Sequence, residues 1–166
     1  MTIQIDSREK ARAIKKIIKT FDQNGVNHYV SKLWVGDYMS LDNPRLIVDR
    51  KQNLSELCSN VCQQHERFRR ELTRANEAGI KLVILCEHGQ GIESLEDVVF
   101  WQNPRSFKRK KNRYGDTIYE KTKAVSGETL YKILSTMQRK YDVDFQFCTK
   151  EETGKRIMEI LSDDGR

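Results

Sequence analysis

The chain has 166 residues, of which 33% are charged and 37% hydrophobic, and its formal net charge is +6. This length suits one domain with a sizeable core, so we expect a single domain over residues 1–166. No apolar run is long enough to cross a bilayer and no secretion leader follows Met1, so we expect a soluble intracellular protein without a membrane partner.

The first predicted elements are a strand that ends at Asp6 and a helix that ends at Gly25. Apolar residues recur at helical spacing between them, and Ser7 is placed to cap the helix. Asp6, at the strand exit, and Glu9, one turn into the helix, either favour the helix N-terminus electrostatically or contribute to a site. A second strand is expected at residues 28–34.

A hairpin is predicted next, because the turn signal Asn43-Pro44 lies between two segments that can pair as strands, residues 38–41 and 45–48. This pairing would return Asp37 to the neighbourhood of Asp49. Gly-Asp is also an ordinary turn dipeptide, so Gly36-Asp37 alone does not indicate a functional site.

The run Leu46-Ile47-Val48 is typical of a buried strand, and residues two apart on a strand share a face. Asp49 and Lys51 therefore point the same way, whereas Arg50 points opposite. Mg²⁺ or Mn²⁺ is a hard cation that prefers oxygen ligands, so Asp37 and Asp49 are predicted to bind one of these metals. Lys51 can orient or deprotonate a water molecule, or stabilise charge on a phosphate.

A long helix is predicted from its N-cap Asn53 to about Ala78, with Gly79 at its end. Gln64 and Arg67 belong to a polar row on its surface that begins near the strand end. The predicted inward residues are Leu54, Leu57, Cys58, Val61, Phe68, Leu72 and Ala75.

The four cysteines match neither a zinc pair nor a disulfide framework, so we expect reduced core thiols. Cys58, Cys62 and His65 share one helical face, which makes a soft-metal site conceivable, but the same face carries the apolar residues named above.

The second half of the chain continues to alternate strands and helices. The predicted elements are a central strand at 81–87 parallel to the first, a short helix from Ser94 to Asn103-Pro104, a Ser126-capped helix, a strand at 143–148, and a final helix with a Thr149–Glu152 capping box. This order predicts an α/β domain with a mixed central sheet flanked by helices.

A basic segment interrupts this order. Between Arg105 and Lys123 there are eight Lys or Arg and two acidic residues, a balance of +6 that equals the charge of the whole chain. We expect a basic, flexible insertion at 105–125, either a mobile loop or a protruding hairpin. Its candidate DNA contacts are Lys108, Arg109, Lys110, Lys111, Arg113, Tyr114 and Tyr119. A solvated, disordered insertion is the alternative.

Three blocks stand in order along the first half of the chain: Ile5-Asp6-Ser7-Arg8-Glu9, Val35-Gly36-Asp37-Tyr38 and Val48-Asp49-Arg50-Lys51. They resemble the D-x-R-E, G-D-Y and E-R-K-x-x-x-D-L blocks of the XPF-type structure-specific endonuclease domain, in the D/E-x-K nuclease superfamily. The resemblance extends over residues 3–87, in which 81–87 corresponds to the family's next buried strand.

Two positions differ from the pattern of that family. Asp49 replaces the family glutamate by a shorter carboxylate that the wider superfamily also uses. Ser55 stands where the family has its second acid, and Glu56 follows one place later, so the role of that acid is not transferred to this chain.

The resemblance implies a restriction-endonuclease-like core and Mg²⁺- or Mn²⁺-dependent hydrolysis of DNA that is branched, flapped or partly single-stranded. It also implies catalytic roles for Asp6 and Glu9, with Asp6 as a further metal ligand, and contact of Arg8 with nucleic acid. Gln64 and Arg67 would border the active site as phosphate contacts, although a solvated helix surface explains them equally well.

Relatives usually join this domain to a helix-hairpin-helix module or a helicase, and neither is recognisable in this sequence. We therefore expect a stand-alone resolvase or nickase from a bacterial virus or prophage. It would act in recombination or repair in the cytoplasm of a bacterial or phage-infected cell, with a homodimer as one arrangement open to it. The alternatives are a non-catalytic DNA-binding protein that retains the fold, and a ribonuclease.

Overall fold

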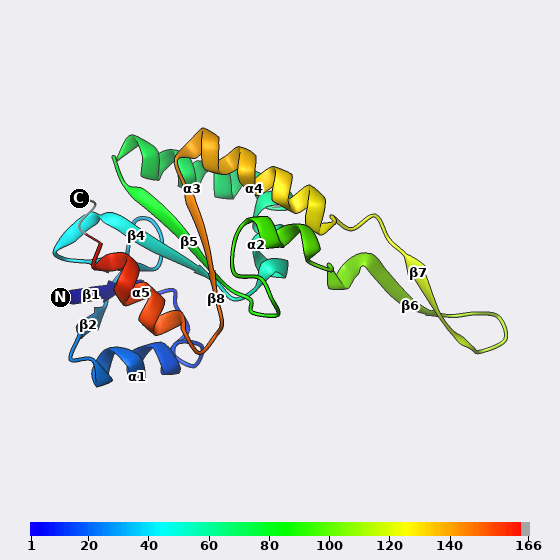
Figure 1. The fold of residues 1–166 in the computed structure, drawn as a ribbon, viewed down its shortest axis with the longest axis horizontal. Coiled ribbons are helices and arrows are strands. Elements are labelled where there is room, and N and C mark those ends of the chain that lie inside the picture. The colour runs from blue at the N-terminus through cyan, green and yellow to red at the C-terminus, as the bar shows by residue number, and fades with distance from the viewer. Residues whose placement is uncertain (164–166) are drawn as a thin grey trace.

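Six strands form one mixed sheet in the order β2-β1-β3-β4-β5-β8, and a separate ribbon pairs β6 with β7 (Figure 1). This computed structural model describes residues 1–163. The elements are β1 (Thr2–Ile5), α1 (Lys15–Gln23), β2 (Asn27–Val30), β3 (Tyr38–Ser40), β4 (Asn43–Lys51), α2 (Leu54–Cys62), α3 (His65–Glu77), β5 (Lys81–Glu87), η1 (Glu96–Phe100), η2 (Pro104–Ser106), β6 (Phe107–Lys111), β7 (Thr117–Lys121), α4 (Gly127–Tyr141), β8 (Asp144–Cys148) and α5 (Thr153–Leu161). The α/β prediction is confirmed.

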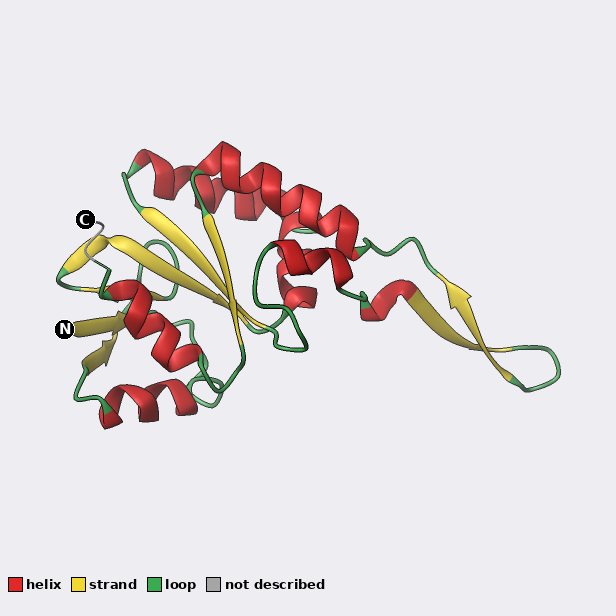
Figure 2. Cartoon of the chain, viewed as in Figure 1, coloured by secondary structure: helices red, strands yellow, loops and turns green. Residues whose placement is uncertain are grey.

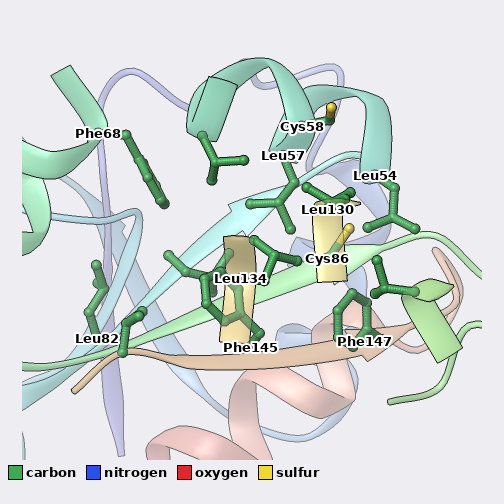
Figure 3. Close-up of a cluster of buried hydrophobic side chains, with 14 of the residues drawn as sticks. Leu54, Leu57, Cys58, Phe68, Leu82, Cys86, Leu130, Leu134, Phe145 and Phe147 are labelled. Carbon is green, nitrogen blue, oxygen red and sulfur yellow. The ribbon is translucent and has the colours of Figure 1, made fainter. Parts of the chain in front are cut away.

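Helices cover both faces of the sheet (Figure 1). Side chains alternate along β5, so Leu82, Ile84 and Cys86 join the core beneath α2, α3 and α4, whereas Val83 and Leu85 join the core beneath α1 and α5. Figure 3 shows the first of these cores. β5 is an interior strand next to the edge strand β8. No helix within residues 1–163 is long and apolar enough to cross a membrane.

The β3–β4 hairpin forms, but its turn differs from the prediction. Ser40 pairs with Asn43, so the turn is Leu41-Asp42, and Asn43-Pro44 opens β4 instead of forming the turn. Proline is compatible with the first residues of a strand, where a ladder hydrogen bond is not required of it. The register still pairs Tyr38 with Val48 and so retains the predicted approach of the two acids.

Helix α1 begins at Lys15, so the prediction of a helix capped by Ser7 is wrong. Asp6 instead fixes a turn: its side chain accepts a hydrogen bond from the N–H of Arg8 (2.7 Å), and its carbonyl accepts one from the N–H of Glu9 (3.1 Å). Aspartate side chains readily bond to the backbone two residues on, which competes with helix formation. Glu9 therefore lies in a loop and not on a helix.

The helix predicted over residues 53–78 is divided into α2 and α3. Asn53 is the N-cap, as predicted, because its side chain accepts a backbone N–H of the first turn. All of the predicted inward residues are buried. At the break, the N–H groups of Gln63 and Gln64 both donate to the carbonyl of Ser59, which interrupts the regular ladder without a glycine or proline.

Strands β6 and β7 form a ribbon that extends away from the central sheet (Figure 2). Its turn is closed by a hydrogen bond from the N–H of Asn112 to the carbonyl of Asp116 (3.0 Å). Its base is closed by a bond from the N–H of Thr122 to the carbonyl of Ser106 (2.8 Å). Of the two forms expected for the basic segment, the structure has the protruding hairpin, and its flexibility stays a prediction.

Candidate active site

A glycine turn places Asp37 beside the end of β4. Gly36 has a φ of +66°, and a Cβ there would lie 2.5 Å from a side-chain carbon on β4, so only glycine fits. The N–H of Asp37 donates to the carbonyl of Val48 (2.9 Å), and its carboxylate accepts from the N–H of Arg50 (2.8 Å). Asp37 therefore lies next to the strand segment that carries Asp49.

Asp49 and Lys51 lie on one face of β4. Lys51 Nζ forms an ion pair with Asp49 Oδ1 (2.9 Å), and Nζ lies 5.6 Å from the centre of the Phe68 ring. The second oxygen, Asp49 Oδ2, is buried and has no hydrogen-bond partner within residues 1–163. A buried carboxylate oxygen without a partner is costly, and a cation at this position would remove the cost.

The charges of this group act strongly on one another. The pKa of Asp37 is raised well above its ordinary value, because burial desolvates its carboxylate and because Asp49 and Glu9 add negative charge nearby. Burial alone would lower the pKa of Lys51, but Asp49 and Asp37 raise it overall, so the ammonium group stays protonated. Asp37 is thus held beside a second carboxylate that disfavours its ionisation.

Arg50 points to the opposite side of β4 and organises a buried network. Its guanidinium binds both oxygens of Glu9, with Nε–Oε2 at 2.9 Å and Nη2–Oε1 at 3.3 Å, and it binds Glu87 Oε1 at 3.2 Å. The hydroxyl of Tyr38 donates to Glu9 Oε2 (2.8 Å). Glu9 is therefore engaged in a buried hydrogen-bond network, and its catalytic role stays a prediction.

Asp6 is similarly occupied. Its carboxylate accepts hydrogen bonds from Arg8 Nε (2.7 Å), Arg8 Nη2 (3.1 Å) and the N–H of Leu33 (2.7 Å), in addition to the N–H of Arg8. Although burial opposes it, the Arg8 contacts hold the pKa of Asp6 below its ordinary value. Four donors thus contact the carboxylate of Asp6, and its role as a metal ligand stays a prediction. The side chain of Arg8 is 54% exposed and stays available to a ligand.

The donor set suits a hard divalent cation. Oxygen is the preferred ligand of Mg²⁺, and Asp37 and Asp49 supply two carboxylates, one of which has an oxygen without a partner among residues 1–163. Within the described residues no group of three or more His, Cys, Asp or Glu could hold a metal, which also leaves the conceivable cysteine site unformed. A cation here would depend on two carboxylates, together with water and substrate oxygens.

An open cleft of about 490 Å³ begins at Lys51. Gln64 and Arg67 line it, so the structure brings both together with the strand end. The lining also includes two charged residues that the sequence did not place at this site: Glu71, which accepts a hydrogen bond from the N–H of Gly36 (3.3 Å), and Arg105, at the base of the ribbon. Glu71 follows Arg67 by four residues, so extending the polar row could have identified it.

Ser55 and Glu56 also line the cleft, where the family pattern has its second acid. The Glu56 carboxylate accepts the N–H of Gln52 (2.6 Å), and its own N–H donates to the side chain of Asn53 (2.8 Å). These two bonds resemble a capping box, except that the Glu56 carboxylate accepts from Gln52 and not from the N-cap Asn53, so Glu56 is engaged in capping α2.

The basic candidates of the ribbon lie apart from the Asp37–Asp49–Lys51 group. Lys108, Arg109, Lys110 and Lys111 are on β6 and are exposed. Arg113 and Tyr114 are in the turn at its tip, where the guanidinium lies 4.7 Å from the centre of the tyrosine ring.

Comparison with known families agrees with this architecture. A family model described as the ERCC4 domain matches residues 5–160. The resemblance found in the sequence is therefore confirmed, and the match extends well beyond the segment 3–87 on which it was based. No curated protein matches the sequence significantly.

Two solved structures have a similar fold. XPF from Aeropyrum pernix superposes with a TM-score of 0.64 and 17% identity over 100% of this chain. XPF from Aeropyrum pernix in complex with DNA superposes with a TM-score of 0.60 and 17% identity over 96% of this chain. The present chain spans 66% and 62% of the lengths of those chains, so it corresponds to part of each.

The Asp37→Asn variant is expected to be more stable than the wild type when no divalent ion is present. The amide removes the charge that Asp49 repels and keeps an oxygen to accept the N–H of Arg50. Thermal unfolding in EDTA should therefore occur about 2–4 °C higher for each kcal/mol of repulsion removed. Mn²⁺ should raise the unfolding temperature of the wild type but not that of the variant.

Asp42→Asn is the matched control, because Asp42 lies exposed in the turn of the same hairpin. It should respond to Mn²⁺ as the wild type does. A lower unfolding temperature for Asp37→Asn in EDTA, or an undiminished response to Mn²⁺, would contradict the assignment of Asp37.

Proposed function

The chain belongs to the ERCC4 domain family, and from that premise we propose that it is a divalent-metal-dependent DNA endonuclease. The observation that carries the proposal is the buried Oδ2 of Asp49, which has no hydrogen-bond partner in the described part of the chain and lies in one group with Asp37, whose pKa is raised, and the charged Lys51. Closely spaced titratable groups with a strongly perturbed pKa are typical of sites that perform chemistry.

Asp37 and Asp49 would hold Mg²⁺ or Mn²⁺. Such an ion, when bound, supplies the Lewis acidity that makes water a nucleophile at neutral pH and neutralises charge on a phosphate. Lys51 stays protonated beside Asp49, which favours charge stabilisation at the phosphate over removal of a proton from water.

The cleft beside Lys51 would receive the DNA backbone. Gln64 and Arg67 from the start of α3, together with Arg105, offer one amide and two guanidinium groups to phosphates. XPF from Aeropyrum pernix has been solved in complex with DNA, and the net charge of +6 supports DNA as the ligand of this chain as well.

The Asp49→Asn and Lys51→Ala variants should each lose activity by a factor of about 10² or more, because they remove a metal ligand and a charge partner of the transition state. Cleavage of end-labelled DNA in Mg²⁺, Mn²⁺ and EDTA is the measurement, with Asp42→Asn as control. Equal cleavage in EDTA would contradict metal dependence. Binding without cleavage by the wild type under all conditions would indicate a non-catalytic DNA-binding protein.

Arg67→Ala and Arg105→Ala should weaken binding more than they slow the chemical step. We expect a higher KM, a nearly unchanged kcat, and a slope of log K against log salt that is smaller by about one for each lost phosphate contact. Arg69→Ala is the control, since Arg69 is exposed on α3 and pairs with Glu66 outside the cleft. Unchanged KM and slope would exclude the cleft as the DNA site.

Branched or flapped DNA is the proposed substrate, with a role in recombination or repair. A flap, a three-way junction and a linear duplex of equal length should be cut at different rates at one salt concentration, with the linear duplex the slowest. Equal rates on all three would remove this part of the proposal. An RNA strand in the same assay separates the deoxyribonuclease from a ribonuclease.

A further inference from the structure

The two faces of the β6–β7 ribbon differ in chemistry. In an antiparallel pair, residues directly opposite each other share a face, and so do alternate residues along one strand. One face, here called the aromatic face, consists of the pairs Phe107–Lys121, Arg109–Tyr119 and Lys111–Thr117. The other, here called the mixed face, consists of the pairs Lys108–Glu120 and Lys110–Ile118.

Positive charge is concentrated on the aromatic face. That face has three cations and no carboxylate, whereas the mixed face has two lysines and one glutamate. Lys110 also forms an ion pair with Glu120, with Nζ 3.5 Å from Oε2, which partly neutralises its charge. A polyanion is therefore attracted more strongly to the aromatic face.

The aromatic rings on this face are uncovered. Phe107 is 59% exposed and Tyr119 is 69% exposed, and every residue of both strands is exposed within the described part of the chain. An isolated two-stranded hairpin is only marginally stable in water. Exposed rings interleaved with cations match the surface on which proteins stack unpaired bases while neutralising the backbone.

We propose that the aromatic face binds a single-stranded segment of DNA. Phe107 and Tyr119 stack on unpaired bases, and Arg109, Lys111 and Lys121 neutralise phosphates. The two rings are diagonal cross-strand neighbours, which lie about 7–8 Å apart, so both can reach bases of the same strand. Bases within a duplex already stack on each other, so this surface discriminates in favour of unpaired DNA.

The ribbon joins the body of the protein at the candidate catalytic cleft. Arg105, in η2 immediately before β6, lines the same cleft as Lys51. A DNA strand bound to the aromatic face would therefore lie on the chain segment that leads through η2 to the cleft. The inference rests on the proposed function for DNA as the ligand, and it assigns to the ribbon the selection of substrates with an unpaired strand.

Binding of labelled oligo-dT in EDTA, measured by fluorescence anisotropy, tests the proposal without cleavage. Two double variants each remove two charges from β6. The first is Arg109→Ser with Lys111→Ser, on the aromatic face, and the second is Lys108→Ser with Lys110→Ser, on the mixed face. The first double variant should make the negative slope of log K against log salt less steep by about 1.4, since each phosphate contact on a single strand contributes about 0.7. The second should change it much less.

The rings are tested with Phe107→Ala combined with Tyr119→Ala, and Ile118→Ala on the mixed face is the matched control. The ring variant should bind oligo-dT at least about tenfold more weakly, because each stacked base contributes substantially to affinity, and should bind a blunt duplex almost as the wild type does. The thermal unfolding of all variants should be unchanged, because every residue of β6 and β7 is exposed.

Equal losses from the two charge variants would overturn the proposal, because binding would then follow net charge and not the face. Equal losses on oligo-dT and on duplex in the ring variant, or no loss on either, would overturn it as well. These outcomes do not depend on catalysis. Failure of the wild type to cleave any DNA would overturn the proposed function, whereas the binding measurements alone decide whether the aromatic face binds single-stranded DNA.

Discussion

The forced approach of Asp37 to Asp49 is the constraint on which the candidate site depends. Two hydrogen bonds set this approach, one from the N–H of Asp37 to the carbonyl of Val48 and one from the N–H of Arg50 to the carboxylate of Asp37, and neither requires a cation. The repulsion is therefore built into the fold, and the turn that brings Asp37 to β4 requires a glycine at position 36. A cation that relieves the repulsion gains affinity from it and stabilises the folded chain through the same contact.

The opposite side of β4 supplies the rigidity that such repulsion requires. Arg50 ties β4 to Glu9, in the loop after β1, and to Glu87, at the end of β5. Asp6 in turn binds the N–H of Leu33 in the loop that leads to Asp37. Buried ion pairs add little net stability because desolvation opposes them, so their value here lies in fixed geometry. One strand thus gives alternate residues to the site and to its support.

Charge is divided between two parts of the molecule. The carboxylates meet at the end of β4, whereas the ribbon, residues 107–121, has six cations and two acidic residues, a balance of +4. If these cations lay against Asp37 and Asp49, they would compensate the carboxylates and reduce the need for a metal ion. Arg67 and Arg105 lie between the two parts, along the cleft, where cations can meet a substrate without neutralising the site.

Local pattern was sufficient for the α/β class, the Asn53 cap, and the common face of Asp49 and Lys51, because strand alternation and capping act over a few neighbouring residues. The three sequence blocks likewise identified the family. Local pattern could not predict that Glu9 would bind Arg50, 41 residues away, or that the carboxylate of Asp6 would accept a hydrogen bond from the N–H of Leu33. Nor did it reveal the break between α2 and α3, or which ribbon residues share a face. Tertiary structure decided these features, because bonds between distant residues depend on how separate elements pack and on strand register, and neither is encoded in any short segment.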